Sequence, residues 1–325
     1  MEHGKVTPQI AEGLLRLKQR IAAAKIPSSR IDETLNLATW NIRDFGKTPR
    51  TDAAIHYIAE ILGQFDLVSI VELRADLGDL KRVMAILGTD WRVVYSGVVP
   101  DPGGNGERSA YLYDRRAVVF NGLAAVAIPP RRKIAGEYLP DQMWWRLPYL
   151  AAFRSGNFDF IMISVHIRWG GKIAERRAEL ALLAQWIETF RESEQGIDRD
   201  VIVVGDFNIP HCDHPLFEAV SKYGLQCPKA LLGGDLGSNL AKNKRYDQIL
   251  QHPSAIYPNS FADQGGVLDF HIDEAHIAEL FPAENALPMT LLRYTQQMSD
   301  HLPLWIQIRT DNDAAQLEQL IQGIA

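Results

Sequence analysis

The stretch VIVVGDFN, residues 201–208, joins a run of β-branched apolar residues to a short polar cluster. The apolar run predicts a buried strand, and Gly205 lets the chain turn sharply where that strand ends. Asp206 and Asn208 are two positions apart, so in an extended segment their side chains point to the same side. A carboxylate and an amide placed in this way can hold a metal-bound water or polarise a water for attack. Taken alone, the same residues also suit a structural turn after a strand.

Similar polar residues lie at the ends of other strand-like runs, far apart in the chain. They are Asn41 and Glu72 after two early runs, His166 after a third, and Asp300 and His301 before the last. Each has an ordinary structural interpretation, such as a turn, a loop cap or a strand-end histidine. Their coincidence at strand ends favours a shared site. Hard oxygen ligands suit Mg²⁺, and histidines suit proton transfer or contact with a phosphate oxygen, so the pattern predicts metal-assisted phosphoester hydrolysis.

Asp247 opens a further strand-like segment directly after Arg245 and Tyr246. A carboxylate in this position is a natural partner for the second ring nitrogen of a histidine, where it fixes the tautomer and raises the pKa of the imidazole. An ion pair with Arg245 is the structural alternative.

The secondary-structure pattern predicts mixed sheets rather than a uniform alternation of strands and helices. We expect a strand pair at 110–113 and 117–120, a hairpin at 150–153 and 158–166, and an irregular basic and aromatic segment at 131–146. Strands alternate with helices early in the chain and pair with one another in its middle, which favours an α/β (α+β) architecture with helices outside the sheets.

The domain organisation follows from the absence of a clear linker in the body of the chain. We expect one domain over residues 31–310, an N-terminal helical extension over 1–30 and a C-terminal helix over 311–325. The two terminal helices can pack on the body or mediate self-association, and the sequence does not indicate an oligomeric state.

Composition limits the classes of partner. The chain has 325 residues and a formal net charge of −6, from 34 Lys and Arg against 40 Asp and Glu. No global basic field draws it onto DNA, although a local basic patch can still contact nucleic acid. Cys212 and Cys227 are expected to be free thiols, since nothing indicates export. No apolar run approaches the roughly 20 residues that span a bilayer, and no signal peptide is evident, so we expect a cytoplasmic protein.

The order of the polar strand ends resembles that of the endonuclease/exonuclease/phosphatase superfamily, which has the DNase I-like fold. The resemblance covers about Leu35 to Ile308, and its most specific parts are Gly205-Asp206-Phe207-Asn208 and Ser299-Asp300-His301. It implies a four-layer α/β/β/α sandwich of two packed mixed β-sheets flanked by helices, with the site at one edge. One departure is Val71, which stands where many members carry a glutamine before the glutamate.

The resemblance also implies roles for individual residues. Glu72 would hold Mg²⁺ or Mn²⁺ with help from Asn41 and Asp300. The other implied catalytic residues are Asp206 and Asn208, which would position the attacking water, His301, which would contact the phosphate with Asp247 behind it, and His166, which stands where nuclease-type members carry a second histidine. Arg108, in the segment Gly106–Tyr111, matches the family arginine that contacts substrate phosphate.

We therefore expect a divalent-metal-dependent phosphodiester hydrolase, acting on DNA as an endonuclease or exonuclease. The alternative is a phosphatase or phosphodiesterase for a small molecule or lipid headgroup, and a more remote one is a non-catalytic nucleic-acid-binding module. The segment 131–146 mixes cations with tryptophans, which suits stacking on bases and pairing with the phosphates of single-stranded or flexible nucleic acid. A solvated loop whose tryptophans cover the core is the other interpretation. Arg168 and Trp169 can line the same groove and bind substrate phosphate.

Overall fold

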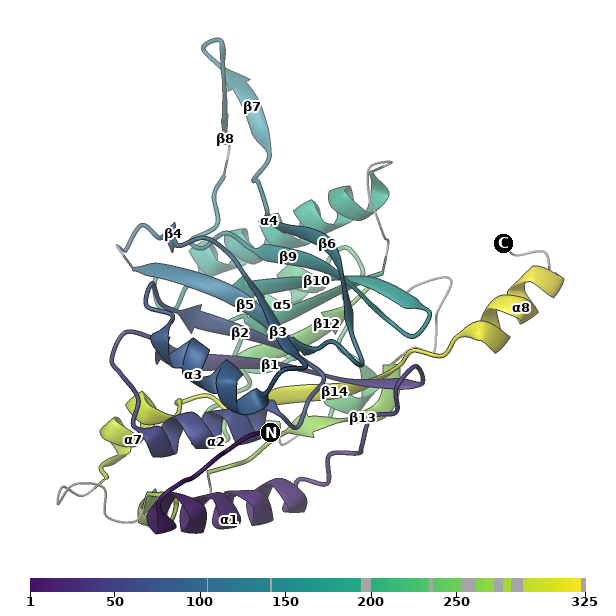
Figure 1. The fold of residues 1–325 in the computed structure, drawn as a ribbon. Coiled ribbons are helices and arrows are strands. Elements are labelled where there is room, and N and C mark those ends of the chain that lie inside the picture. Colours follow the sequence, from purple (N-terminus) through teal and green to yellow (C-terminus); the bar gives the residue numbers. More distant parts are fainter. Residues whose placement is uncertain are drawn as a thin grey trace.

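The computed structural model describes residues 1–103, 105–140, 142–193, 200–233, 236–252, 261–271, 277–281 and 289–322. Within these ranges two β-sheets pack face to face, and helices cover their outer sides (Figure 1). The architecture is the four-layer α/β/β/α sandwich expected from the sequence, and that prediction is confirmed.

The first sheet has seven strands among the described residues, in the order β13-β14-β1-β2-β5-β3, with β4 paired to β5. Its strands are β1 (Thr34–Phe45), β2 (Leu67–Leu73), β3 (Trp91–Tyr95), β4 (Val99–Pro100), β5 (Gly106–Asp114), β13 (Phe261–Val267) and β14 (Leu304–Arg309). β1 and β2 run parallel, while β1 and β14 run antiparallel, so the sheet is mixed.

The second sheet has five strands in the described part of the chain, in the order β12-β11-β10-β9-β6. Its strands are β6 (Val119–Val126), β9 (Tyr149–Ser155), β10 (Phe158–His166), β11 (Val201–Asp206) and β12 (Asp247–Gln251). β10 and β11 are parallel and the remaining pairs are antiparallel. The hairpin expected at 150–166 is confirmed as β9 and β10.

Alternate residues of the central strands build the core between the sheets, and the same rows end in polar side chains. Three such rows are Leu35, Leu37 and Asn41 in β1, Phe160, Met162 and His166 in β10, and Ile202, Val204 and Asp206 in β11. Because side chains alternate between the two faces of a strand, one period of two residues both fills the core and carries a polar group to its end. The carboxyl ends of the parallel pairs therefore bring these polar groups to one edge.

Helices cover the outer face of each sheet (Figure 1). α1 (Pro8–Ala23), α2 (Asp52–Leu62) and α3 (Gly78–Leu87) pack with the outward residues of the first sheet, and α4 (Ile173–Glu192) and α5 (Pro215–Ser221) pack with those of the second. The remaining helices are short or terminal: η1 (Lys229–Leu231), α6 (Ile277–Leu280), α7 (Leu291–Gln297) and α8 (Asp313–Gln322). Among the described helices, none combines the length and apolar character needed to cross a bilayer.

The N-terminal helix α1 belongs to the packed body. Its start is fixed by the Thr7 hydroxyl, which accepts a hydrogen bond from the Ile10 amide at 3.3 Å, and by Pro8 at the first helical position. Its buried face, which includes Leu14 and Leu17, joins the core that also contains α2. The C-terminal helix α8 instead extends away from the sandwich (Figure 1).

Two predictions about the middle of the chain are wrong. The segments expected to pair around Asp114 are β5 and β6, which lie in different sheets, because the turn after Asp114 carries the chain from one sheet to the other. The segment 131–146, expected to be irregular, contains a two-stranded hairpin of β7 (Arg131–Ile134) and β8 (Glu137–Pro140). We call this hairpin, with its turn, the arm.

Candidate active site

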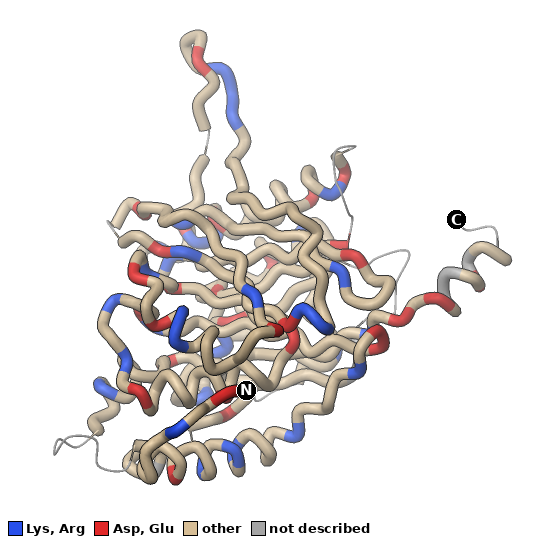
Figure 2. Tube along the Cα trace, viewed as in Figure 1, with Lys and Arg blue, Asp and Glu red and all other residues tan. Residues whose placement is uncertain are grey.

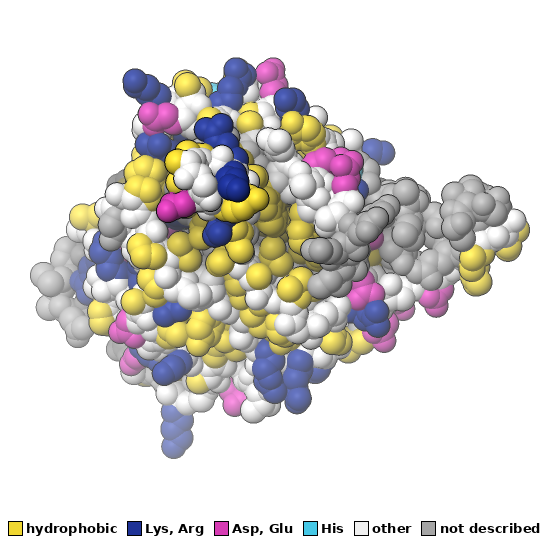
Figure 3. All heavy atoms as spheres, turned by 90° about the horizontal axis from the view of Figure 1, so that it is seen from above, with side chains coloured by type: hydrophobic (Ala, Val, Ile, Leu, Met, Phe, Trp, Pro, Cys, Tyr) yellow, Lys and Arg dark blue, Asp and Glu magenta, His cyan; other side chains and the backbone are white. Residues whose placement is uncertain are grey.

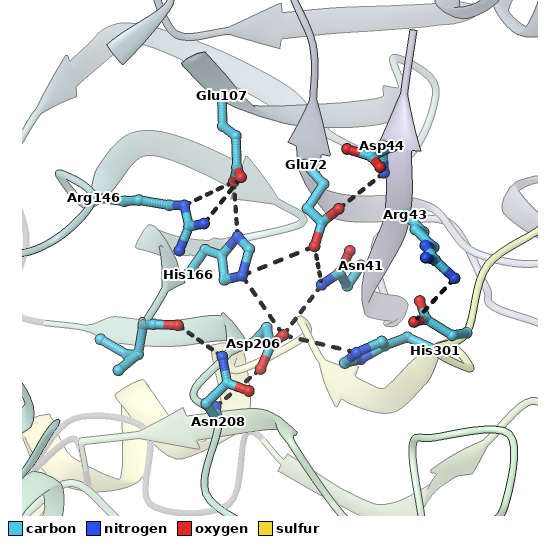
Figure 4. Close-up of polar contacts among 12 residues, drawn as sticks. Asn41, Arg43, Asp44, Glu72, Glu107, Arg146, His166, Asp206, Asn208 and His301 are labelled. Carbon is cyan, nitrogen blue, oxygen red and sulfur yellow. Dashed lines mark hydrogen bonds and ion pairs between the residues drawn. The ribbon is translucent and has the colours of Figure 1, made fainter. Parts of the chain in front are cut away.

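A cleft of about 450 Å³ opens at the edge where the polar ends of β1, β2, β10 and β11 meet. Its lining includes Asn41, Glu72, His166, Asp206, Asn208, Asp300 and His301 from the predicted set, together with Arg43, Asp44, Lys47, Arg74, Asn105, Glu107, Arg146, Trp169 and Tyr246. Figure 4 shows the central side chains converging on Asp206 from both sheets. The structure thus brings together seven of the residues that the sequence singled out.

Asn41 links the two sheets at the centre of the cleft. Its Nδ2 donates hydrogen bonds of 3.1 Å to Glu72 Oε1 and of 3.1 Å to Asp206 Oδ2. The other oxygen of Asp206 accepts a bond of 2.9 Å from the Asn208 amide, and Asn208 Nδ2 donates to the Ile167 carbonyl at 2.7 Å. Asp206 and Asn208 are both buried, so this network fixes the direction in which the Asp206 carboxylate faces the cleft.

Several site residues have backbone conformations that L-residues rarely adopt. Glu72 has φ +62° and Asn208 φ +51°, and each such residue costs about 1–3 kcal/mol unless its surroundings fix it. At Glu72 the pairing of β2 with β5 shifts register, and Glu72 Oε2 accepts a bond of 2.8 Å from the Asp44 amide. The left-handed residue turns Glu72 toward the cleft instead of continuing the alternation of β2. Strain at this edge is typical of a functional site.

Gly205 lets β10 and β11 lie close together just before the site. Its φ is +127°, and a Cβ built there would lie 2.0 Å from the Val165 carbonyl oxygen. A larger residue would therefore push β11 away from β10, and Asp206 away from His166, with which it is paired in register. The sequence-based role of Gly205 as a turn residue is thus sharpened to one of close strand approach.

His301 is held by Asp247, as the sequence predicted for a histidine of the site. His301 Nδ1 and Asp247 Oδ2 are 2.6 Å apart. Asp247 begins β12 of the second sheet, and His301 lies just before β14 of the first. Burial alone would lower the pKa of His301, but the charge and hydrogen bond of Asp247, with Asp206 and Asp300 nearby, raise the pKa to about 10. His301 is therefore an imidazolium at neutral pH.

His166 has a matching carboxylate, Glu107, that sequence reasoning missed. His166 Nδ1 lies 2.9 Å from Glu107 Oε2, and Arg146 Nε also lies 2.9 Å from that carboxylate. Burial alone would raise the pKa of Glu107, but His166, Arg146 and Arg74 lower it to about 2. Burial alone would lower the pKa of His166, but Glu107 outweighs this effect and raises it.

The two histidine–carboxylate pairs flank a single oxygen. His166 Nε2 and His301 Nε2 each lie 3.8 Å from Asp206 Oδ2 (Figure 4). His166 Nε2 is also 4.0 Å from Glu72 Oε1. Two imidazoles, each with a raised pKa, therefore face the same carboxylate from opposite sides, and an anionic group entering the cleft would meet both. This arrangement can stabilise a phosphate group and position a water beside it.

A known protein family matches most of the chain that builds this cleft. The model of the Endonuclease/Exonuclease/phosphatase family matches residues 38–270, which is more than half of the chain. The chain belongs to this family. The resemblance inferred from the polar strand ends is thus confirmed, and the chain is placed among phosphoester hydrolases.

The chain has low sequence identity to individual proteins that it resembles. A protein named Deoxyribonuclease from Thioalkalivibrio sp. (strain K90mix) is 30% identical over 193 residues, which are 57% of this chain and 49% of that protein. The chain therefore spans about half the length of this curated relative. A family protein from Bacteroides thetaiotaomicron is 21% identical with a TM-score of 0.56, covering 86% of this chain and 98% of its own. D. rerio TDP2 complexed with single strand DNA product is 15% identical with a TM-score of 0.56, covering 85% and 98%. The two solved structures support the shared fold.

Arg108 and Arg168, which we expected to bind substrate phosphate, do not line the cleft. β5 turns Glu107 into the cleft and Arg108 to the opposite face, where Arg108 donates to the Ser96 carbonyl at 2.8 Å. Arg168 lies 4.4 Å from the centre of the Trp145 ring and pairs with Glu175 at 2.8 Å, in a neighbouring pocket. The expectation that these two line the phosphate site is not met.

Other cations line the cleft in place of those two. They are Arg43, Lys47, Arg74 and Arg146. Arg74 and Arg146 are mostly buried near Glu107, whereas Arg43 lies near the rim, where its Nη1 is 3.7 Å from Asp300 Oδ2. The Asp300 side chain is 47% exposed and so can be reached from solvent. Arg74 directly follows the end of β2, so its position could have marked it, whereas Lys47 and Arg146 follow no strand-end motif.

The oxygens of the cleft fit a hard divalent cation. Within the described residues, Asn41 Oδ1 is buried and has no hydrogen-bond partner, and Glu72 Oε1 lies close to the same side chain. No group of three or more His, Cys, Asp or Glu side chains in the described part of the chain forms a ready cage. A donor set of one carboxylate and one amide oxygen suits Mg²⁺, which keeps several waters and uses few protein ligands.

Proposed function

We propose that this protein is a divalent-metal-dependent phosphodiesterase that cleaves DNA by in-line attack of a water. The observation that carries the proposal is the pair of imidazoles, each backed by a buried carboxylate, at 3.8 Å from Asp206. A phosphodiester has one anionic charge and two non-bridging oxygens, so two imidazole N–H donors on opposite sides match it. The relative named Deoxyribonuclease and the fold neighbour solved with a single strand DNA product support this substrate class.

The residues divide the chemistry between them. Asp206, fixed by Asn41 and Asn208, is placed to accept a hydrogen bond from the attacking water. His301, protonated at neutral pH, donates to a phosphate oxygen and stabilises the charge that grows in the transition state. His166 supplies the second donor, and Asp247 and Glu107 hold the two rings in place.

Glu72, Asn41 and, from the rim, Asp300 would hold the metal ion. Glu72 and Asn41 are 3.1 Å apart between oxygen and amide nitrogen, whereas Asp300 is engaged by Arg43. When bound, Mg²⁺ or Mn²⁺ would polarise a phosphoryl oxygen and neutralise developing charge.

A phosphomonoester of a small molecule is the second candidate. The net charge of −6 favours it, since no global basic field attracts a polyanion. A fold neighbour at a TM-score of 0.50 is named mannosyl-6-phosphatase. The relative named Deoxyribonuclease favours the diester.

The test measures four substrates with Mg²⁺ and with a chelator: supercoiled plasmid, single-stranded DNA, bis(p-nitrophenyl) phosphate and p-nitrophenyl phosphate. Wild type is compared with Asp206→Ala and His301→Ala, and with His211→Ala as a control, because His211 is exposed outside the cleft. Chelator-sensitive cleavage of DNA and of the diester, lost in the first two variants only, supports the proposal. Hydrolysis of the monoester alone would contradict it in favour of the phosphatase.

A further inference from the structure

The arm is the most exposed regular structure of the molecule's described part. β7 and β8 pair from Arg131↔Pro140 to Ile134↔Glu137, and every residue of both strands is exposed. Two residues close the hairpin, Ala135 with φ +51° and Gly136 with φ +96°, a pattern of the tight type I′ turn. Figure 1 shows the arm standing away from both sheets.

A two-stranded ribbon of this kind is marginally stable in water on its own. Its apolar side chains stay exposed: Tyr138 is 67% exposed, Leu139 42% and Ile134 39%. The arm therefore presents a surface that a partner can cover, and its charge indicates which kind. Arg131, Arg132 and Lys133 are consecutive, against the single anion Glu137 in the two strands.

The cations of the arm occur on both faces of the ribbon. Consecutive residues of a strand point to opposite sides, so Arg131 and Lys133 lie on one face and Arg132 on the other. Figure 2 shows this run of positive charge on β7, far from most of the acidic residues. In Figure 3, seen from above, Lys and Arg side chains lie in front of apolar ones. A positive ribbon on a protein of net charge −6 matches a polyanion.

The base of the arm is joined to the active site. Val126 and Ser164 both pair with Tyr149, and Ser164 lies two residues before His166, so β6, which leads to the arm, ends level with the end of β10, with β9 between them. After β8 the chain reaches Arg146, which lines the cleft.

A second pocket of about 360 Å³ is lined in part by residues 142–145, the segment that leads from β8 to Arg146 of the cleft. Arg168 and Trp145 line it, stacked 4.4 Å apart between guanidinium and ring centre, with Glu175 paired to the arginine. Trp169, 66% exposed, stands at the cleft itself. Aromatic and cationic side chains thus line both this pocket and the cleft.

We propose that the arm is a second binding element for double-stranded DNA, which it grips in a groove while a phosphodiester of one strand lies in the cleft. A major groove about 12 Å wide admits a two-stranded ribbon, and four residues of strand extend about 13 Å. Cations on both faces then meet phosphates on both walls of the groove, which a single strand does not offer. The inference rests on the proposed function of the cleft and adds the form of the DNA and the element that selects it.

The test compares wild type with the triple variant Arg131→Ala, Arg132→Ala, Lys133→Ala. A matched control removes three exposed cations elsewhere: Arg30→Ala, Lys81→Ala and Lys229→Ala. Binding of a short duplex and of the same single strand is measured by fluorescence anisotropy from about 50 to 200 mM salt, the range over which electrostatic binding to phosphates is revealed. Hydrolysis of bis(p-nitrophenyl) phosphate reports on the cleft and on folding.

The arm variant is expected to bind duplex at least about tenfold more weakly, and its salt slope should fall by about 0.9 for each phosphate that the removed cations neutralise in wild type. Its affinity for the single strand and its turnover of bis(p-nitrophenyl) phosphate should match those of the control variant. Unchanged duplex affinity and slope would overturn the role of the arm, and an equal weakening on single strands would overturn the choice of duplex. Absence of diester turnover in the wild type would instead contradict the proposed function of the cleft.

Discussion

The hydroxyl of Ser69 donates a hydrogen bond of 2.9 Å to the hydroxyl of Ser164, and this bond joins the two sheets directly behind the cleft. Both side chains are fully buried. Ser69 lies three residues before Glu72 in β2, and Ser164 lies two residues before His166 in β10. The bond therefore sets the spacing between these two strands, which belong to opposite sheets and carry residues of the cleft.

Changing both of these serines to alanine should cost less than the sum of the two single changes. Ser164→Ala leaves the Ser69 hydroxyl buried without its partner, which costs about 1–3 kcal/mol. In the double variant no orphaned hydroxyl remains, so the combined loss should be smaller than the sum of the two single losses. Urea unfolding of the four proteins measures this coupling, and strictly additive losses would show that the bond is energetically unimportant.

The alkaline limit of activity should depend on Asp247. The pKa of His301 is raised to about 10, so its stabilising interaction is fully present below its ordinary pKa of 6.5 and is lost as pH rises through about 10. Asp247→Asn removes the main cause of the rise, and the alkaline limb of kcat/KM should move from near 10 toward neutral pH. The measurement is a pH–rate profile on bis(p-nitrophenyl) phosphate. The idea is refuted by a variant that loses activity equally at every pH.

Glu107→Gln should weaken catalysis although Glu107 contacts His166 and not the metal ligands. The pKa of Glu107 is lowered to about 2 from an ordinary 4.5, so its contribution to stability is present above 4.5 and is lost as pH falls toward 2. The glutamine variant should lower kcat by about 10²-fold, because His166 loses the carboxylate charge that raises its pKa and helps to orient its ring. Glu175→Gln, also an arginine-paired glutamate, serves as the control. Equal kcat values in the two variants would contradict the role of Glu107.

Gly205→Ala should destabilise the fold and not only the site. The new Cβ would meet the Val165 carbonyl oxygen at 2.0 Å in a left-handed backbone, so we expect a loss of more than about 2 kcal/mol in thermal or urea unfolding. Gly122→Ala separates the two causes, since Gly122 also has a positive φ, +90°, but no atom within 4 Å of the built Cβ. Equal losses in both variants would mean that backbone conformation alone requires glycine.

Much of the candidate site could be predicted because several of its residues end apolar runs. Asn41, His166 and Asp206 continue the two-residue rows of the core, so the period of the strand determines which way they face. Glu107 was missed because it lies at the beginning of its strand, and one position decides between it and Arg108. To choose between two adjacent residues, one must know which residues of β5 face the cleft. The sequence of the preceding loop does not determine this.

The sheet-crossing turn and the arm could not be predicted for a different reason. The turn after Asp114 has ordinary hairpin residues, and only packing between sheets decides that β5 and β6 separate. In the arm, charged and apolar residues do not alternate along the strands, because neither face of the hairpin is buried. A period of two is visible in a sequence only where one side of the strand meets a core.

The arm is anchored in a way that makes it replaceable. The Ala127 amide donates to the Pro148 carbonyl at 2.8 Å, and the neighbouring residues continue into the ladder of β6 and β9. The sheet is thus closed beneath the arm, and the ladder that carries His166 does not include the arm. Under the proposed role of the arm, lengthening, shortening or exchanging residues 130–140 would alter which nucleic acids are admitted without rebuilding the cleft. The choice of target and the chemistry can then diverge separately during evolution or in a designed enzyme.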